Sequence, residues 1–143
     1  MTKKNNWLPT EKNIEDYSLL KDMLLAQRQE FDLLSKKKSD GQLNKMKIKM
    51  VNRVLEPLNG LLKNESSHKF LDVLNEDDMP TNSDVVLIIS QYEKALLNFK
   101  NKYFLIDKNY RKKYGDAQAR WNIKENPISE AGNENDDDED DEE

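Results

Sequence analysis

The sequence predicts an all-α fold: three long amphipathic helices in an up-down-up bundle, with one short extra helix and a disordered acidic C-terminal tail. Apolar residues recur at helical spacing over long stretches, and only four Gly and four Pro interrupt the 143 residues, too few for a turn-rich β-sandwich. Charged residues make up 36% of the chain, which is typical of helices with wide solvated faces. We expect a flexible N-terminus over residues 1–7, the bundle over residues 8–121 and the tail over residues 122–143.

The first long helix is expected to begin at Thr10 or Asn13, because either side chain can cap the free N–H groups of a first turn. Its seam advances by alternating steps of three and four residues, with Gln27 as the polar member, and this spacing places the seam on one face of a helix. The apolar members are Tyr17, Leu20, Leu24, Phe31 and Leu34. Three Lys at 36–38 suit the negative end of the helix dipole, and Ser-Asp-Gly at 39–41 predicts a turn.

The second helix is expected over residues 42–63. Its apolar residues cover an arc of roughly 200° at 100° per residue, which is wider than the stripe of a surface helix, so we expect it to pack on two sides. They are Leu43, Met46, Ile48, Met50, Val51, Val54, Leu55, Leu58 and Leu62. Pro57 is expected to kink or break this helix, since it lacks a backbone N–H. A short apolar cluster at residues 70–74 predicts the extra helix.

The third helix has the clearest signal, with Asn82 or Ser83 as the expected N-cap. Its apolar residues recur at alternating steps of four and three, and the series resumes after one extra residue. The members are Val85, Ile89, Tyr92, Leu96, Phe99, Tyr103, Ile106 and Tyr110, then Tyr114, Ala117 and Trp121. Gly115 favours a bend or break between residues 107 and 115. This helix is expected to extend beyond its neighbours.

Acidic residues are concentrated at the C-terminal end. Residues 122–143 hold eleven Asp or Glu and one Lys, a net charge of −10, whereas the residues before them carry +5. Blocks of like charge stay solvated and often serve as interaction tails. Three interpretations remain open: the tail keeps the protein soluble, folds back onto basic residues of the body, or competes with nucleic acid for them.

The residue types that most catalytic and metal sites require are scarce. The chain has no Cys and a single His, His68, which lies in a polar segment, so the spacing of a zinc site or a Ser-His-Asp triad is missing. No Gly-rich phosphate loop occurs, and the acids between residues 72 and 84 lack the spacing of a calcium loop. We therefore expect a protein that is not an enzyme, with no catalytic residue, no cofactor, no metal and no small-molecule substrate.

The hydropathy pattern predicts no membrane segment. The longest apolar run, residues 85–89, is far too short to span a bilayer. The first nine residues lack the apolar stretch of a signal peptide. We expect a protein without membrane association and in the cytoplasm.

Two basic clusters are candidates for contact with phosphate. In an up-down-up bundle the turn after the first helix lies near the end of the third, so both clusters would converge on one pole and the acids of residues 72–84 would occupy the other. A basic pole with aromatic neighbours suits a nucleic-acid backbone. The candidate residues are Lys45, Lys49, Arg53, Lys108, Arg111, Lys112 and Lys113.

The seam of the long third helix is the second candidate surface, because an apolar seam beyond its neighbours can dock another chain. The candidate docking residues are Tyr110, Tyr114 and Trp121. The expected function is a non-catalytic interaction or adaptor protein that docks another protein or itself through helical seams. The alternative is a nucleic-acid-associated accessory protein whose basic pole is masked by the acidic tail.

Overall fold

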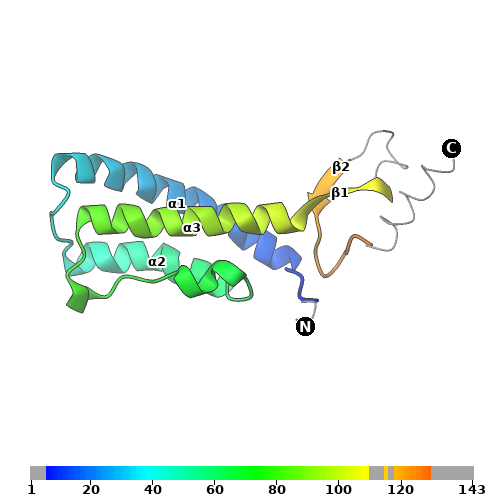
Figure 1. Cartoon of the computed structure of the whole chain (residues 1–143), viewed down its shortest axis with the longest axis horizontal. Coiled ribbons are helices and arrows are strands. Elements are labelled where there is room, and N and C mark those ends of the chain that lie inside the picture. Colours follow the sequence, from blue (N-terminus) through cyan, green and yellow to red (C-terminus); the bar gives the residue numbers. More distant parts are fainter. Residues whose placement is uncertain (1–5, 110–114, 116–117, 130–143) are drawn as a thin grey trace. The chain divides into compact units, whose positions relative to one another are not determined.

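The computed structural model describes residues 6–109, 115 and 118–129. Within this part the chain is mostly helical, with three long helices and a two-stranded sheet (Figure 1). The chain forms two compact units: the helical unit, Glu15–Phe99, and the hairpin unit, which combines Met1–Ile14 with Lys100–Glu143. The all-α expectation is therefore confirmed only in its coarser form, since a small sheet accompanies the helices.

The first helix, α1, spans Glu11–Lys37 and begins with a reciprocal cap. The side chain of Thr10 accepts a hydrogen bond from the backbone N–H of Asn13 at 3.1 Å, and the side chain of Asn13 accepts one from the N–H of Thr10 at 2.9 Å. This pair satisfies two of the donors that a helix start leaves free. The predicted start of the helix is confirmed.

The second helix, α2, spans Lys45–Leu61, with the side chain of Asn44 as its cap. Pro57 lies inside the helix without ending it, so the break expected there does not occur. A return segment follows, which contains the 3-10 turns η1, Ser66–Phe70, and η2, Glu76–Asp78. The extra helix is thus a 3-10 turn before residues 71–74, whereas those residues themselves form no helix.

The third helix, α3, spans Asn82–Tyr103. Its N-cap is Thr81, one residue before the predicted positions. The side chain of Asp84 accepts a hydrogen bond from the backbone N–H of Thr81 at 2.9 Å, and the side chain of Thr81 accepts one from the N–H of Asp84 at 3.2 Å. Asn82 instead donates its side-chain N–H to the carbonyl of Lys38 at 2.9 Å. The start of α3 is thereby fastened to the turn that follows α1.

The predicted up-down-up order is wrong, because α2 and α3 run in the same direction (Figure 1). Near the start of both helices, the N–H of Leu43 donates to the carbonyl of Pro80 at 3.0 Å. Further along both, the side chain of Asn59 donates to the hydroxyl of Tyr92 at 3.2 Å. The return segment carries the chain back along α2 before α3 begins, so the order is up, down, down.

The core of the helical unit confirms much of the predicted seams. From α1 and α3 it takes Tyr17, Leu24, Phe31, Val85, Ile89, Tyr92, Leu96 and Phe99, and from α2 chiefly Val51, Val54, Leu55 and Leu58. The rings of Tyr17 and Phe99 stack at 5.5 Å between centroids and 20° between planes. Burial of these apolar side chains is the main driving force for packing the three helices.

The predicted continuation of the third helix past Tyr103 is wrong. Strands β1, Phe104–Asp107, and β2, Gln118–Trp121, pair as an antiparallel hairpin in which Phe104 lies opposite Trp121. Their rings pack edge to face, with centroids 5.2 Å apart. Gly115, in the connection, has φ of 96°, a left-handed value that Gly adopts without a side-chain clash. The predicted bend or break is thus a break, and it lies earlier than residues 107–115, where α3 ends at Tyr103 and β1 begins.

Parts of the predicted tail and of the predicted flexible N-terminus make specific contacts in the hairpin unit. Ile128 is buried, and its N–H donates to the side chain of Asn122 at 2.7 Å. Trp7 packs edge to face on Tyr103, with centroids 5.7 Å apart. The N–H of Lys124 donates to the carbonyl of Pro9 at 2.8 Å. Residues assigned to the start of the tail therefore pack in this unit, and residues 130–143 lie outside the described part.

A polar network fastens the return segment to α2 and α3. The side-chain amide of Asn59 donates to the carbonyl of Leu71 at 3.1 Å, and its carbonyl oxygen accepts a hydrogen bond from His68 Nε2 at 2.8 Å. The hydroxyl of Tyr92, which is fully buried, donates to the carbonyl of Asp72 at 3.0 Å. His68 therefore has a structural partner in α2.

Replacing Tyr92 with Phe tests this network. The change leaves the carbonyl of Asp72 and one N–H of Asn59 without their partner, so we expect the free energy of unfolding to fall by about 1–2 kcal/mol, the cost of unpaired buried polar groups. Urea denaturation measures it. An unchanged midpoint would contradict a structural role for the hydroxyl.

The same variant has an expected pH signature. Burial raises the pKa of Tyr92 above its ordinary value of 10.0, as does the charge of Asp72, against the hydrogen bond from Asn59, which lowers it. Above pH 10 the unfolded chain loses this proton before the folded one does, so the stability falls as the pH rises through that window. Tyr92→Phe should remove part of this fall.

Candidate docking surface

Besides Leu25, which is 51% exposed and lies roughly 120° from Leu19 around α1, five large apolar side chains of α1 and α2 are exposed to solvent. Their exposed fractions are 62% for Leu19, 48% for Met23, 58% for Leu33, 62% for Met46 and 52% for Met50. Scattered exposed apolar residues are ordinary on a soluble protein, whereas a contiguous group marks a site of interaction. Whether these five form one surface depends on the geometry of the two helices.

Helical geometry places the five residues on two narrow stripes. At 100° per residue, Leu19, Met23 and Leu33 lie within roughly 80° of one another on α1, and they point away from the buried Tyr17 and Leu24. Met46 and Met50 lie one turn apart on α2. Each helix therefore carries an exposed apolar stripe in addition to its buried one.

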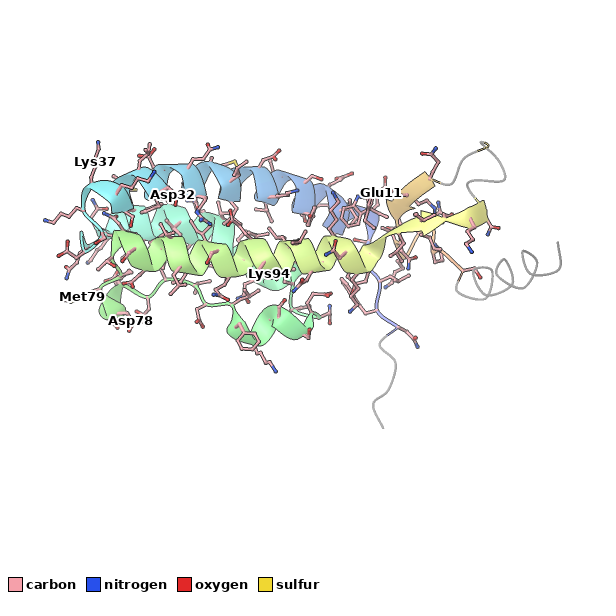
Figure 2. All side chains as sticks on the ribbon, turned by 45° about the horizontal axis from the view of Figure 1, so that its top comes forward. Glu11, Asp32, Lys37, Asp78, Met79 and Lys94 are labelled. Carbon is pink, nitrogen blue, oxygen red and sulfur yellow. The ribbon has the colours of Figure 1, made fainter. Side chains whose placement is uncertain are left out.

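A contact between the helices brings the two stripes together. The side-chain Nε2 of Gln27, one turn after Met23, donates to the backbone carbonyl of Met50 at 3.2 Å. The Oε1 of Gln27 is inaccessible to solvent and has no hydrogen-bond partner among the described residues. We call the surface made by Leu19, Met23, Leu33, Met46 and Met50 the α1–α2 face. Figures 1 and 2 show α1, α2 and α3 side by side, with α3 resting against the α1–α2 pair.

The apolar arc on α2 is divided between buried residues and an exposed margin. The residues of this arc that the structure buries, from Leu43 to Leu62, leave Met46 and Met50 at its exposed margin. As the sequence predicted, α2 is packed on more than one side, against α1 through Gln27 and against the return segment through Asn52 and Asn59, while Met46 and Met50 stay exposed. The exposed stripe on α1 was not predicted from the sequence, which indicated a single apolar seam on this helix.

Charged residues flank the α1–α2 face with opposite signs on its two helices. On α2 and just after it, Lys49, Arg53 and Lys63 are exposed. The exposed acids of α1 are Glu11 at its start and, further along the helix, Glu15, Asp22 and Glu30. No ion pair within the described part of the chain involves Glu15, Asp22, Glu30 or the three bases. The apolar residues are thus flanked by three acids along α1 and by three bases on or just after α2, although Lys12 and Lys37 on α1 and Glu56 on α2 are exposed as well.

The geometric premise of the predicted basic pole is wrong. Lys45 and Glu76 form an exposed ion pair at 3.9 Å. In the turn before α2, the backbone N–H of Leu43 donates to the carbonyl of Pro80, and the carbonyl of Gly41 accepts a hydrogen bond from the N–H of Asn82. The first basic cluster therefore adjoins the acidic stretch instead of lying at the opposite pole. The cause is the parallel course of α2 and α3, which places the start of α3 beside the turn after α1.

The remaining predicted site residues are distributed over both units. Lys49 and Arg53 lie on the exposed side of α2, Lys108 directly follows β1, and Trp121 is half-buried against Phe104 in the hairpin. Trp121 therefore packs within its own unit, although it was predicted to dock a partner. The others, Tyr110, Arg111, Lys112, Lys113 and Tyr114, lie outside the described residues.

Three further findings concern other kinds of site. Across residues 6–109, 115 and 118–129, no three His, Cys, Asp or Glu side chains come close enough together to hold a metal ion. In the same part of the chain, no helix is both long and apolar enough to cross a bilayer. No family model matches the chain, and no curated protein and no solved structure is significantly similar to it.

Proposed function

We propose that this protein is a non-catalytic adaptor that docks another protein chain, or a second copy of itself, on the α1–α2 face. The observation that carries the proposal is an exposed apolar stripe on each of two antiparallel helices, joined by the hydrogen bond between Gln27 and Met50. Two adjacent helices with exposed apolar stripes form the kind of groove into which an amphipathic helix packs.

The chemistry of the surface supports docking. Methionine side chains are flexible and polarisable, so they adapt to the shape of an apolar partner. Complete burial of a Leu or Met side chain contributes about 1.5–3 kcal/mol, and each of the five is still about half exposed. Docking can therefore recover a useful part of this free energy at several positions, against the entropic cost of association.

A capture experiment with matched variants tests the proposal. The tagged full chain should capture its partner, and Met46→Glu or Met50→Glu should abolish the capture, because each places a carboxylate in the apolar centre of the face. Leu87→Glu is the control, since Leu87 on α3 is exposed by 60%, against 62% for Met46. Bound proteins are compared by mass spectrometry.

Circular dichroism of each variant should show unchanged helicity, as expected for exposed positions. Loss of the partner in the Leu87 variant as well, or its retention in both Met variants, would contradict docking on this face.

A nucleic-acid-associated function is the alternative, and it would use Lys49 and Arg53, which form no ion pair with any residue that the structure describes. The adjoining acids of residues 72–84 weigh against it, because carboxylates repel a phosphate backbone. Nuclease treatment and a salt series during the capture separate the two: phosphate contacts release counterions and weaken steeply with salt, whereas an apolar docking surface does not. Binding that disappears on nuclease treatment and survives Met50→Glu would favour the alternative.

A further inference from the structure

We infer that the occupant of the α1–α2 face is the same face of a second copy, related by a two-fold axis parallel to the helices, so that α1 of each copy lies against α2 of the other. This inference rests on the proposed function and names the partner. It follows from the charges that flank the face and from the heights at which they lie along the two helices.

The Gln27–Met50 contact fixes the register of α1 against α2. Because the helices are antiparallel, each residue forward along α1 corresponds to one residue backward along α2. Counted along the helix axes from this contact, Asp22 lies at the same height as residue 55 of α2, which is near Arg53. Glu30 lies at the same height as residue 47, which is near Lys49. Each match is within two residues, or about 3 Å at 1.5 Å per residue.

The third acid of α1 extends the same pattern. Glu15 lies at the height of residue 62, next to Lys63, which follows the end of α2. Acids on α1 thus coincide in height with bases on α2 at three levels. Within one copy these residues form no ion pairs in the described part of the chain.

The wheel positions place these charges within the α1–α2 face or at its margin. Asp22 and Glu30 lie within roughly 60° of Leu19 on α1, and Lys49 and Arg53 lie within roughly 60° of Met46 on α2. They are close enough to the apolar stripes to meet a chain that covers those stripes. Among the described residues of one copy they have no ion-pair partner, and in the dimer they would gain one.

The direction of the two-fold axis decides which charges meet. An axis parallel to the helices keeps heights unchanged and sets α1 against the second copy's α2, so acids face bases at all three levels. A perpendicular axis in the interface plane sets α1 against α1 and α2 against α2, so acids face acids and bases face bases. Complementary charges fix orientation and exclude wrong arrangements, which favours the parallel axis.

The apolar centre and the charged residues have different roles in this dimer. The five apolar side chains supply the affinity, since exposed ion pairs contribute little to it. The charges select the pairing of helices. In an isologous interface each contact occurs twice, so one charge reversal acts at two places.

A charge-exchange experiment on the full chain tests the arrangement by sedimentation velocity over a wide range of concentration. Asp22→Arg places a new Arg against Arg53 of the other copy, and Arg53→Asp places a new Asp against Asp22. Each single variant should dimerise at least about tenfold more weakly than the wild type, and the double variant should recover the wild-type affinity. Asp77→Arg, an exposed reversal in η2, is the control and should leave dimerisation unchanged.

Mixing the two single variants provides the sharpest result. In the mixed dimer, the Arg introduced at position 22 of one chain meets the Asp introduced at position 53 of the other. The second contact joins the unchanged Arg53 of the first chain to the unchanged Asp22 of the second, so both contacts pair opposite charges. A mixed dimer should therefore form at concentrations where neither variant dimerises alone. This outcome requires α1 to lie against α2 of the other copy, which a merely structural effect of the substitutions cannot produce.

The outcomes that overturn the inference differ from those that overturn the proposed function. A chain that stays monomeric at every concentration would overturn the second copy as occupant, while a captured partner that depends on Met50 would keep the docking function. A dimer abolished by Met50→Glu but insensitive to both charge reversals would overturn the parallel axis. Insensitivity of both dimerisation and capture to Met46→Glu and Met50→Glu would overturn both proposals.

Discussion

Replacing Phe99 with Ala should lower the free energy of unfolding of the helical unit by about 3–5 kcal/mol, the range for a buried aromatic truncated to Ala. Phe99 is fully buried, and its ring stacks on that of Tyr17 at 5.5 Å between centroids. The change removes this stacking, which adds to the burial term, and leaves a cavity between α1 and α3. Urea denaturation followed by circular dichroism measures the loss.

Leu97→Ala is the matched control for Phe99→Ala, since Leu97 lies on the same helix two residues earlier and is 49% exposed. Its truncation should cost less than about 1 kcal/mol, as for a partly exposed position away from the core. Equal losses in the two variants would contradict the orientation of α3, and a near-neutral Phe99→Ala would contradict the packing of α1 against it.

Replacing Arg120 with Ala should have the largest effect on the hairpin unit. Its Nε donates to Asp107 Oδ2 at 2.7 Å, and its terminal nitrogens donate to the carbonyls of Trp121, Asn126 and Pro127 at 3.2, 2.6 and 3.3 Å. Asp107 is buried, with 7% exposure, so the change leaves a buried carboxylate without this partner. Loss of a cation opposite a buried charge costs several kcal/mol.

We expect about 2–4 kcal/mol less protection against hydrogen exchange, read at the amides of β1, β2 and residues 122–128, with little change in α2. The lower end of this range reflects the 19% exposure of the Arg120 side chain, because solvent screens part of the interaction. Arg120→Lys should fall between the wild type and Ala, since it keeps the charge but loses the planar fork of donors. Unchanged protection in Arg120→Ala would show that strand pairing alone holds the hairpin.

The α1–α2 face illustrates how a sequence signal can be correct and still be incompletely interpreted. The apolar arc of α2 was too wide for a helix with one buried side, and this predicted packing on two sides. The structure buries Leu55 and Leu58 completely and leaves Met46 and Met50 more than half exposed. The return segment and α1 cover the two sides of the buried part of the arc, and the proposed dimer would cover Met46 and Met50, so this margin of the arc would reflect assembly and not the folding of a single chain.

The basic residues show the opposite case, in which a reasonable inference failed through a wrong premise. Lys45, Lys49 and Arg53 are exposed as the sequence suggested. Their grouping with a second basic cluster depended on the up-down-up order, which the structure does not have. With Lys45 beside Glu76, the charge of this region is mixed, and the role proposed for Lys49 and Arg53 is now the orientation of a second copy.

Local sequence determined the helices and their starts, because periodicity and caps act over a few residues. The seam of α1, the cap at Thr10 and the core positions Val85, Ile89 and Tyr92 were all predicted, and each depends on contacts within a helix or on the period of 3.6 residues. The N-cap of α3 is Thr81, one residue before the predicted Asn82, because the side chain of Asn82 is hydrogen-bonded to the carbonyl of Lys38.

The tertiary structure alone decided the direction of α3 and the hairpin. The amide of Asn52 binds both the N–H and the carbonyl of Leu74 at 2.9 Å, which holds the return segment extended along α2 and sends the chain back before α3 begins. Past Tyr103 the helical spacing continued in sequence, but pairing with β2 satisfied the backbone of Phe104–Asp107 instead. Both outcomes depend on hydrogen bonds between residues distant in sequence, which helical periodicity does not encode.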